Sequence, residues 1–94
     1  MLSRYHLDLA FIGTDGVTLA AGCTTHDEME AQTDRAFLDR SKRVVVVADS
    51  SKLGRSAFAH ICDLSEVDDL ITDNEANPDL LKEVADASVH VMTC

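Results

Sequence analysis

Short apolar runs separated by polar loops dominate the first half of the chain. Residues 7–12 (LDLAFI) form such a run and lead into Gly-Thr-Asp-Gly at residues 13–16, which predicts a strand followed by a loop. Residues 44–48 (VVVVA) contain no polar position, a pattern typical of a strand buried on both faces of a parallel sheet. Residues 17–22 are too weakly patterned to separate an extended segment from a hairpin.

A helix is predicted between these two strands. Thr25 and Glu28 have the spacing of a capping box, in which a Thr hydroxyl and a Glu carboxylate satisfy free amides of the first turn. Lys42 and Arg43 are cations suited to the carboxyl end of a helix. The helix is therefore predicted over residues 26–42. Its buried face is predicted from residues spaced three or four apart, namely Met29, Thr33, Ala36, Phe37 and Arg40.

The second half of the chain predicts one more helix and two more strands. Residues 55–62 fit a strand or a helix equally well, whereas residues 68–73 indicate a short strand with acidic flanks. Asn77 followed by Pro78 is a strong helix start, with a capping side chain and then Pro in the first turn. The buried face of that helix consists of Leu80, Leu81 and Val84, and a strand over residues 89–92 closes the chain.

The first strand, helix and second strand form one unit, which predicts a right-handed crossover and parallel strands. The fold class predicted is therefore α/β, with a Rossmann-like parallel sheet flanked by helices. The polar loops at residues 13–16 and 49–52 then follow the carboxyl ends of parallel strands, where open α/β sheets bind ligands.

Composition and charge restrict the kind of partner. The 94 residues carry eight Lys and Arg against seventeen Asp and Glu, a formal charge of -9, so this chain is not expected to bind nucleic acid. The longest apolar runs fall far below the roughly 20 residues that a membrane span needs, and the first 25 residues do not resemble a secretion signal. We therefore predict a cytoplasmic protein that does not bind membranes.

The cysteine pattern encodes neither a disulfide framework nor a zinc site. Cys23, Cys62 and Cys94 are odd in number, far apart in the sequence and without His at metal-ligand spacing. Three reduced, mostly packed thiols are expected. No metal and no cofactor is predicted.

Several short motifs together carry a family resemblance. Their order and spacing resemble the effector-binding domain of DeoR-family transcriptional regulators over roughly residues 5–94. The motif Asp-Ser-Ser-Lys-x-Gly at residues 49–54 is the most specific of them. The others are DLAFIGTDG at 8–16, GCTT at 22–25, EA and RA at 30–31 and 35–36, and LITD at 70–73.

The resemblance implies a non-catalytic sensor domain whose fold is similar to that of ribose-5-phosphate isomerase. Such a domain binds a phosphorylated sugar or a related small-molecule effector and thereby alters DNA binding. Residues 1–94 are expected to form a single domain, the C-terminal portion of that sensor, with the DNA-binding helix-turn-helix and the first part of the sensor absent. Self-association is expected, because a strand such as 44–48 needs cover on both faces and only two helices are predicted to supply it.

The resemblance also implies which residues bind the ligand. Lys52 is the expected phosphate contact, since its ammonium meets a phosphate as a point charge, and backbone amides of the glycine turn add directional donors. Asp15 or Glu30 would accept hydrogen bonds from sugar hydroxyls. The full predicted set is Asp8, Gly13, Asp15, Gly16, Glu30, Asp49 and Lys52. Without the resemblance, Asp49 and Lys52 fit simple turn residues as well, and Glu30 fits stabilisation of the helix dipole.

Two other classes of function remain open at this point. A fragment of a sugar-phosphate isomerase-like enzyme would use Glu30 or Asp15 as a base and Lys52 as an electrostatic clamp. An acidic protein-interaction module would use the second half of the chain as a docking face. That half, residues 53–94, holds nine acidic and two basic residues.

Overall fold

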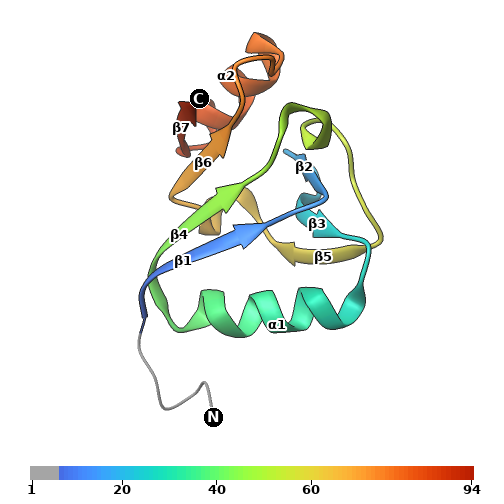
Figure 1. Ribbon diagram of the computed structural model, residues 1–94, viewed down its shortest axis with the longest axis vertical. Coiled ribbons are helices and arrows are strands. Elements are labelled where there is room, and N and C mark those ends of the chain that lie inside the picture. The colour runs from blue at the N-terminus through green and yellow to red at the C-terminus, as the bar shows by residue number, and fades with distance from the viewer. Residues whose placement is uncertain (1–6) are drawn as a thin grey trace.

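Two sheets and two α-helices make up the part of the chain that the computed structural model describes, residues 7–94 (Figure 1). The first six residues of the predicted domain lie outside that part. Two short 3-10 helices, η2 and η3, complete the elements. In chain order these are β1 (Leu7–Gly13), β2 (Gly16–Thr18), β3 (Gly22–Thr25), α1 (Glu28–Asp39), β4 (Ser41–Val47), η2 (Ser50–Lys52), β5 (Ala59–Cys62), η3 (Leu64–Glu66), β6 (Asp69–Thr72), α2 (Pro78–Asp86) and β7 (His90–Thr93).

A four-stranded parallel sheet in the order β1-β4-β6-β7 is the main element of the fold. The predicted α/β class and the parallel pairing of the first two strands are confirmed, since β1 lies directly beside β4 from Leu9↔Arg43 to Gly13↔Val47. β4 is a central strand, as its run of valines predicts, but the expected burial on both faces is wrong, because Val47 is 43% exposed. Within residues 7–94, no helix is long and apolar enough to cross a membrane.

The start of α1 differs from the predicted capping box. Asp27 is the N-cap, and its carboxylate accepts a 2.9 Å hydrogen bond from the Met29 N–H. Thr25 belongs instead to β3, and its hydroxyl donates to the carboxylate of Asp15 at 2.9 Å. The prediction of a Thr25–Glu28 capping box is therefore wrong, because the Thr25 hydroxyl binds Asp15, which is distant in the sequence.

The end and the buried face of α1 also differ from the prediction. The helix ends at Asp39, and the chain turns directly into β4, which contains Lys42 and Arg43. The side chains that pack into the core are Ala31 and Leu38. The predicted face is wrong, since its first member, Met29, is 77% exposed. Arg43 lies in β4 rather than at the end of the helix, and it pairs with Asp69. Because Asp69 is distant in the sequence, this ion pair leaves no local sequence signal.

The second helix follows its prediction. Asn77 caps α2 by accepting a 2.8 Å hydrogen bond from the Asp79 N–H, and Pro78 occupies the first turn. Val84 is buried, and Leu80 and Leu81 pack partly against the core. The strands predicted before and after this helix are β6 and β7.

A three-stranded antiparallel sheet, in the order β2-β3-β5, is the element that the sequence pattern did not reveal. The undecided residues 17–22 contribute to a hairpin of β2 and β3, and the undecided residues 55–62 contain the strand β5. Each of these strands has only three or four residues, too few for a clear periodicity.

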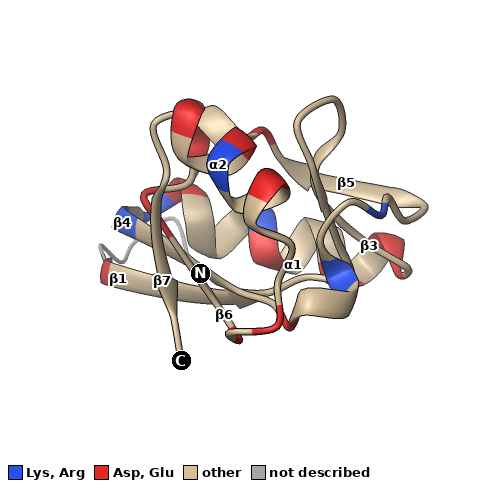
Figure 2. Cartoon of the chain, turned by 90° about the horizontal axis from the view of Figure 1, so that it is seen from above, with Lys and Arg blue, Asp and Glu red and all other residues tan. Residues whose placement is uncertain are grey.

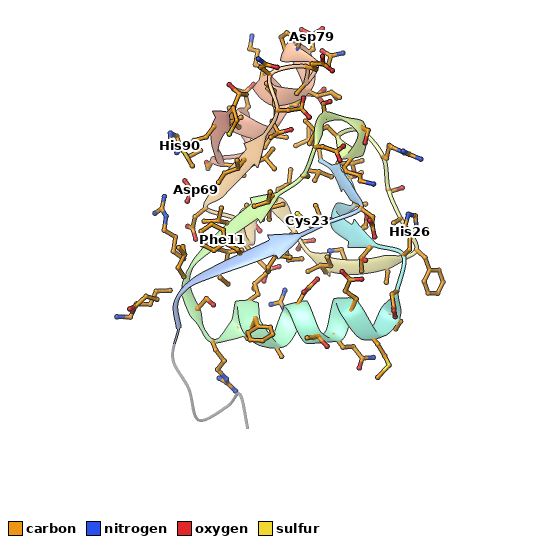
Figure 3. The ribbon with its side chains drawn as sticks, viewed as in Figure 1. Phe11, Cys23, His26, Asp69, Asp79 and His90 are labelled. Atoms are coloured by element: carbon orange, nitrogen blue, oxygen red, sulfur yellow. The ribbon has the colours of Figure 1, made fainter. Side chains whose placement is uncertain are left out.

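The core lies on one face of the parallel sheet. Ile12, Val46 and Leu70 point into a single apolar cluster that also includes residues of both helices and of the antiparallel sheet. The opposite face holds large apolar side chains that take no part in this cluster. They are Leu9, Phe11, Val47 and Met92, between 39% and 64% exposed. Phe11, the most exposed of them, is labelled in Figure 3.

A buried carboxylate lies in the middle of this open face. Asp69 of β6 is 3% exposed, and its carboxylate accepts hydrogen bonds from the Arg43 guanidinium at 2.7 Å and from Nδ1 of His90 at 3.1 Å (Figure 3). The Arg43 hydrogen bond, followed by that of His90, holds the pKa of Asp69 below its usual range. The open face therefore carries a buried carboxylate that is hydrogen-bonded by side chains of the same face and lies between apolar side chains.

The one-sided core predicts different stability effects for neighbouring valines of β4. Val46→Ala removes methyl groups from a fully buried side chain and should lower the free energy of unfolding by about 2 kcal/mol. Val47→Ala, at a 43% exposed position on the open face, should lower it by less than about 1 kcal/mol. Urea denaturation of the two variants checks this difference. Equal losses would contradict the assignment of the core to one face.

Candidate functional site

Two polar loops meet at the carboxyl edge of the parallel sheet. Gly13 and Val47, the last residues of β1 and β4, are partners in the register, so the loops that follow begin side by side. One loop leads through Thr14 and Asp15 into β2, and the other leads through Asp49 into η2. The predicted convergence of these loops is confirmed.

Thr24 of β3 holds the first loop in place. Its carbonyl oxygen accepts hydrogen bonds from the Thr14 hydroxyl at 2.6 Å and from the Asp15 N–H at 2.9 Å. The Thr24 hydroxyl oxygen accepts a third from the Ala57 N–H at 2.8 Å. Thr14 and Thr24 are buried, so these bonds are protected from water and fix the loop backbone.

Asp15 is the ordered carboxylate of this edge. One of its oxygens, Oδ2, accepts hydrogen bonds from the Thr25 hydroxyl at 2.9 Å and from the His26 N–H at 3.1 Å. Among residues 7–94, the other oxygen has no hydrogen-bond partner. The His26 N–H and then the Thr25 hydroxyl lower the pKa of Asp15, and the ammonium of Lys52 adds to this effect. Asp15 is thus charged at neutral pH and lies within electrostatic reach of Lys52.

The second loop is a single turn closed by its own side chains. The carboxylate of Asp49 caps η2 by accepting a 3.0 Å hydrogen bond from the Ser51 N–H. The carboxylate of Asp73, after β6, accepts a 2.8 Å hydrogen bond from the Ser50 N–H and ties the turn to the sheet. Lys52 ends this turn, is partly exposed and, within residues 7–94, makes no ion pair.

The two loops are also joined through the backbone. The Gly54 N–H donates to the Val17 carbonyl oxygen at 2.8 Å, and Val17 forms a parallel bridge with Leu53. A Cβ atom at Gly16 would lie 2.3 Å from the Arg55 carbonyl oxygen, whereas a Cβ atom at Gly13 would meet nothing within 4 Å. Gly16 is therefore required by the close approach of the second loop, and Gly13 leaves open space at the end of β1.

The remaining predicted residues lie in different places. Glu30 is exposed in the first turn of α1, which starts two residues after the His26 amide that binds Asp15, so it belongs near the same edge. Asp8 lies at the opposite end of β1. Its side chain is 97% exposed and forms only a 3.9 Å ion pair with Lys42. The structure brings together the two loops that carry Gly13, Asp15, Gly16, Asp49 and Lys52, whereas Glu30 lies in the first turn of α1 and Asp8 at the far end of β1.

The sequence interpretation missed the residues that support the edge. Thr14, Thr24 and Thr25 are buried threonines that position Asp15, and Asp73 positions the turn of Lys52. The sequence did contain a signal, because Thr24 and Thr25 belong to the GCTT motif and Asp73 belongs to the LITD motif of the resemblance. Only the fold shows that these motifs lie under the loops.

A hollow of about 220 Å³ lies at the same edge, on the open side of the sheet. It is mainly apolar and is lined by residues around the ends of β4, β6 and β7: Val47, Ala48, Asp49, Ile71, Thr72, Asp73 and Cys94. Small-molecule sites usually measure roughly 300 Å³ or more. No group of three acidic, His or Cys side chains in residues 7–94 has the arrangement of a metal site. The hollow is smaller than a usual small-molecule site, and it is lined by Asp49 but not by Lys52 or Asp15. The edge itself offers the Lys52 ammonium and ordered carboxylates, which suit recognition of a small polar molecule.

Comparison with known proteins shows which family this chain is similar to. The model of the DeoR C terminal sensor domain matches residues 1–74. A putative aga operon transcriptional repressor of Escherichia coli O157:H7 is 37% identical over 91 residues, which is 97% of this chain and 34% of the relative.

Two other relatives are also regulators of transcription. The HTH-type transcriptional repressor GlcR of Bacillus subtilis is 41% identical over 83 residues, 85% of this chain and 32% of the relative. The glycerol-3-phosphate regulon repressor of Escherichia coli K12 is 28% identical over 93 residues, 99% of this chain and 37% of the relative. The chain spans about a third of the length of these curated relatives.

The two glycines of the first loop give opposite expectations. Gly16→Ala should lower the free energy of unfolding by at least about 2 kcal/mol, because the added methyl group meets the Arg55 backbone. Gly13→Ala should change it by no more than about 1 kcal/mol, because the space there is open. Urea denaturation compares the two variants. A Gly16→Ala variant as stable as Gly13→Ala would show that the loops do not pack as described.

Proposed function

Because the chain belongs to the family of DeoR C-terminal sensor domains, we propose that it senses a phosphorylated sugar or a related phosphorylated metabolite. The observation that carries this proposal is the shared position of the Asp15 loop and the Lys52 loop, which begin side by side at the carboxyl edge of the parallel sheet and are joined by the Gly54–Val17 hydrogen bond. Their two loops come from neighbouring strands and are fixed by hydrogen bonds to Thr24 and Asp73. The edge is therefore preorganised for a polar ligand.

Lys52 supplies the charge for the phosphate in this proposal. Its ammonium is partly exposed and, within residues 7–94, free of ion pairs, so it binds an anion without losing an existing salt bridge. The chain as a whole carries a charge of -9, which makes a local cation necessary for any anionic ligand. One relative is named the glycerol-3-phosphate regulon repressor, which supports a phosphorylated ligand.

The carboxylates supply recognition of hydroxyl groups. Asp15 is held in one orientation by two hydrogen bonds to a single oxygen, and its second oxygen accepts from the ligand. Glu30 provides a further acceptor from the first turn of α1. We leave Asp8 out of the proposed site because the length of β1 separates it from Asp15.

The ligand acts on transcription rather than undergoing a reaction. The relatives are named as regulators of transcription, and they are about three times as long as this chain. The proposal is that ligand binding at this edge controls DNA binding by a separate part of a longer protein. An acidic docking function has weaker support, because the acidic residues spread over α2 and the loops around it rather than forming one recessed site (Figure 2).

The proposed phosphate contact predicts a selective loss of binding. Lys52→Ala should weaken the binding of phosphorylated sugars by about 1.5–3 kcal/mol, the range of a hydrogen bond to a charged group. Lys82→Ala, an exposed cation on α2, is the matched control and should leave the affinity unchanged. Calorimetric titration with a hexose phosphate and with the parent hexose measures both effects. Equal affinity of wild type and Lys52→Ala would remove Lys52 from the site.

We also propose that the chain self-associates through the open face of the parallel sheet. That face carries four exposed apolar side chains around Asp69, whose carboxylate already accepts hydrogen bonds from Arg43 and His90 of the same face. Burial of apolar surface contributes roughly 25 cal/mol per Å² to the free energy of association. The free energy gained by burying several hundred Å² therefore outweighs the screened charge repulsion between two copies.

Self-association through this face predicts unequal effects of two exposed phenylalanines. Phe11→Ser on the open face should shift the chain toward a monomer, and Phe58→Ser, at an 81% exposed position before β5, should not. Light scattering at about 100 μM distinguishes these outcomes. A wild-type monomer with cooperative unfolding would contradict the proposal.

A further inference from the structure

Two buried cysteines face each other across the antiparallel sheet. Cys23 of β3 and Cys62 of β5 are direct partners in the register, and both are 0% exposed. Figure 3 shows Cys23 in the interior of the fold. Directly opposed residues of antiparallel strands have Cα atoms roughly 4.5–5.5 Å apart, within the roughly 4.4–6.8 Å that a disulfide spans. The pairing brings together residues that lie far apart in the sequence.

The local backbone brings the two strands close at this point. Gly22 has a φ of 69°, and a Cβ atom there would lie 2.2 Å from the Cys62 carbonyl oxygen. The register also shifts beside Cys23, where the pairing passes from Cys62 to His60, and both Ile61 and Cys62 point into the core. This irregularity and the glycine place the Cys62 side chain against that of Cys23.

The two thiols also interact with each other. The neighbouring Cys62 thiol and burial together hold the pKa of Cys23 above its usual range. The two thiols thus lie close enough to influence each other, as their register predicts.

We propose that Cys23 and Cys62 are a redox modification site that forms a reversible cross-strand disulfide in the presence of a peroxide. The thiolate of one of the two cysteines attacks one oxygen of hydrogen peroxide, breaks the O–O bond and becomes a sulfenic acid, while the second oxygen leaves as water after gaining protons. The sulfur of the other cysteine then attacks the oxidised sulfur and releases a second water. Two thiols are oxidised to one disulfide, and one peroxide is reduced to two waters.

The position of β5 at the edge of its sheet gives the oxidant a route to these thiols. In the order β2-β3-β5, β5 has a strand neighbour only on the β3 side, and it is only four residues long. Opening of a short edge strand needs less free energy than unfolding of the whole domain. Oxidation therefore proceeds through local opening, and closure then returns the two sulfurs to their register.

The disulfide lies next to the support of the polar edge. Thr24, which holds the Thr14 and Asp15 loop, directly follows Cys23 in β3. A covalent link from β3 to β5 closes a loop from Cys23 to Cys62 and restricts the unfolded chain. The expected effect on the folded protein is a higher melting temperature and a more rigid β3.

The test uses Cys94→Ser, which keeps only the two facing cysteines and changes an exposed residue. After treatment with hydrogen peroxide and alkylation of free thiols, trypsin should release one linked species made of residues 5–35 and 56–82. Its mass should be two hydrogen atoms below the sum of the peptides, and dithiothreitol should separate them. The melting temperature should rise by roughly 10 °C on oxidation and return on reduction.

The double variant Cys23→Ala, Cys94→Ser is the matched control, because it leaves Cys62 without a partner. It should give no linked species within one chain and no rise in melting temperature. The proposal is overturned if Cys94→Ser keeps both thiols available for alkylation after peroxide. It is equally overturned if Cys62 proceeds to sulfinic acid without a link, or if the link forms only in unfolding concentrations of urea.

Discussion

The parallel pairing of β1 with β4 is the constraint on which the rest of the structure depends. It requires a crossover connection, which α1 provides together with the β2–β3 hairpin, and it brings the carboxyl ends of both strands to one edge. The valines of β4 make this strand the centre of the sheet. The polar edge with Asp15 and Lys52 is a direct consequence of that pairing.

All covering elements lie on one face of the sheet, and this asymmetry follows from the topology. The strand order β1-β4-β6-β7 advances in one direction, so each right-handed crossover returns on the same side. Val46 is thereby fully buried, whereas Val47 and Phe11 remain exposed on the other side. The hollow beside Asp49 has the same origin, since one of its sides is the uncovered face. The stability of the fold and the shape of this hollow thus depend on the same uneven distribution of apolar cover.

Much of the fold could be predicted from the sequence because its signals are local. The valine run of β4, the Asn77-Pro78 start of α2 and the glycine turn after β1 each act within a few residues. The N-cap of α1 and the antiparallel sheet could not be predicted, because the Thr25 hydroxyl binds Asp15 and β5 pairs with β3 across many residues. For the same reason the sequence indicated Asp15 and Lys52 but not Thr24 or Asp73, which support them through the fold.

The most direct test of the ligand site is an NMR titration that follows the backbone amides of the chain. A hexose 6-phosphate should shift the amide signals of residues 14–16 and 50–52, because these amides lie at the ends of β1 and β4. The unphosphorylated hexose should leave the signals of residues 50–52 unchanged, since the proposal assigns Lys52 to the phosphate. Shifts confined to other parts of the chain, or equal shifts with both sugars, would contradict a phosphate site at this edge.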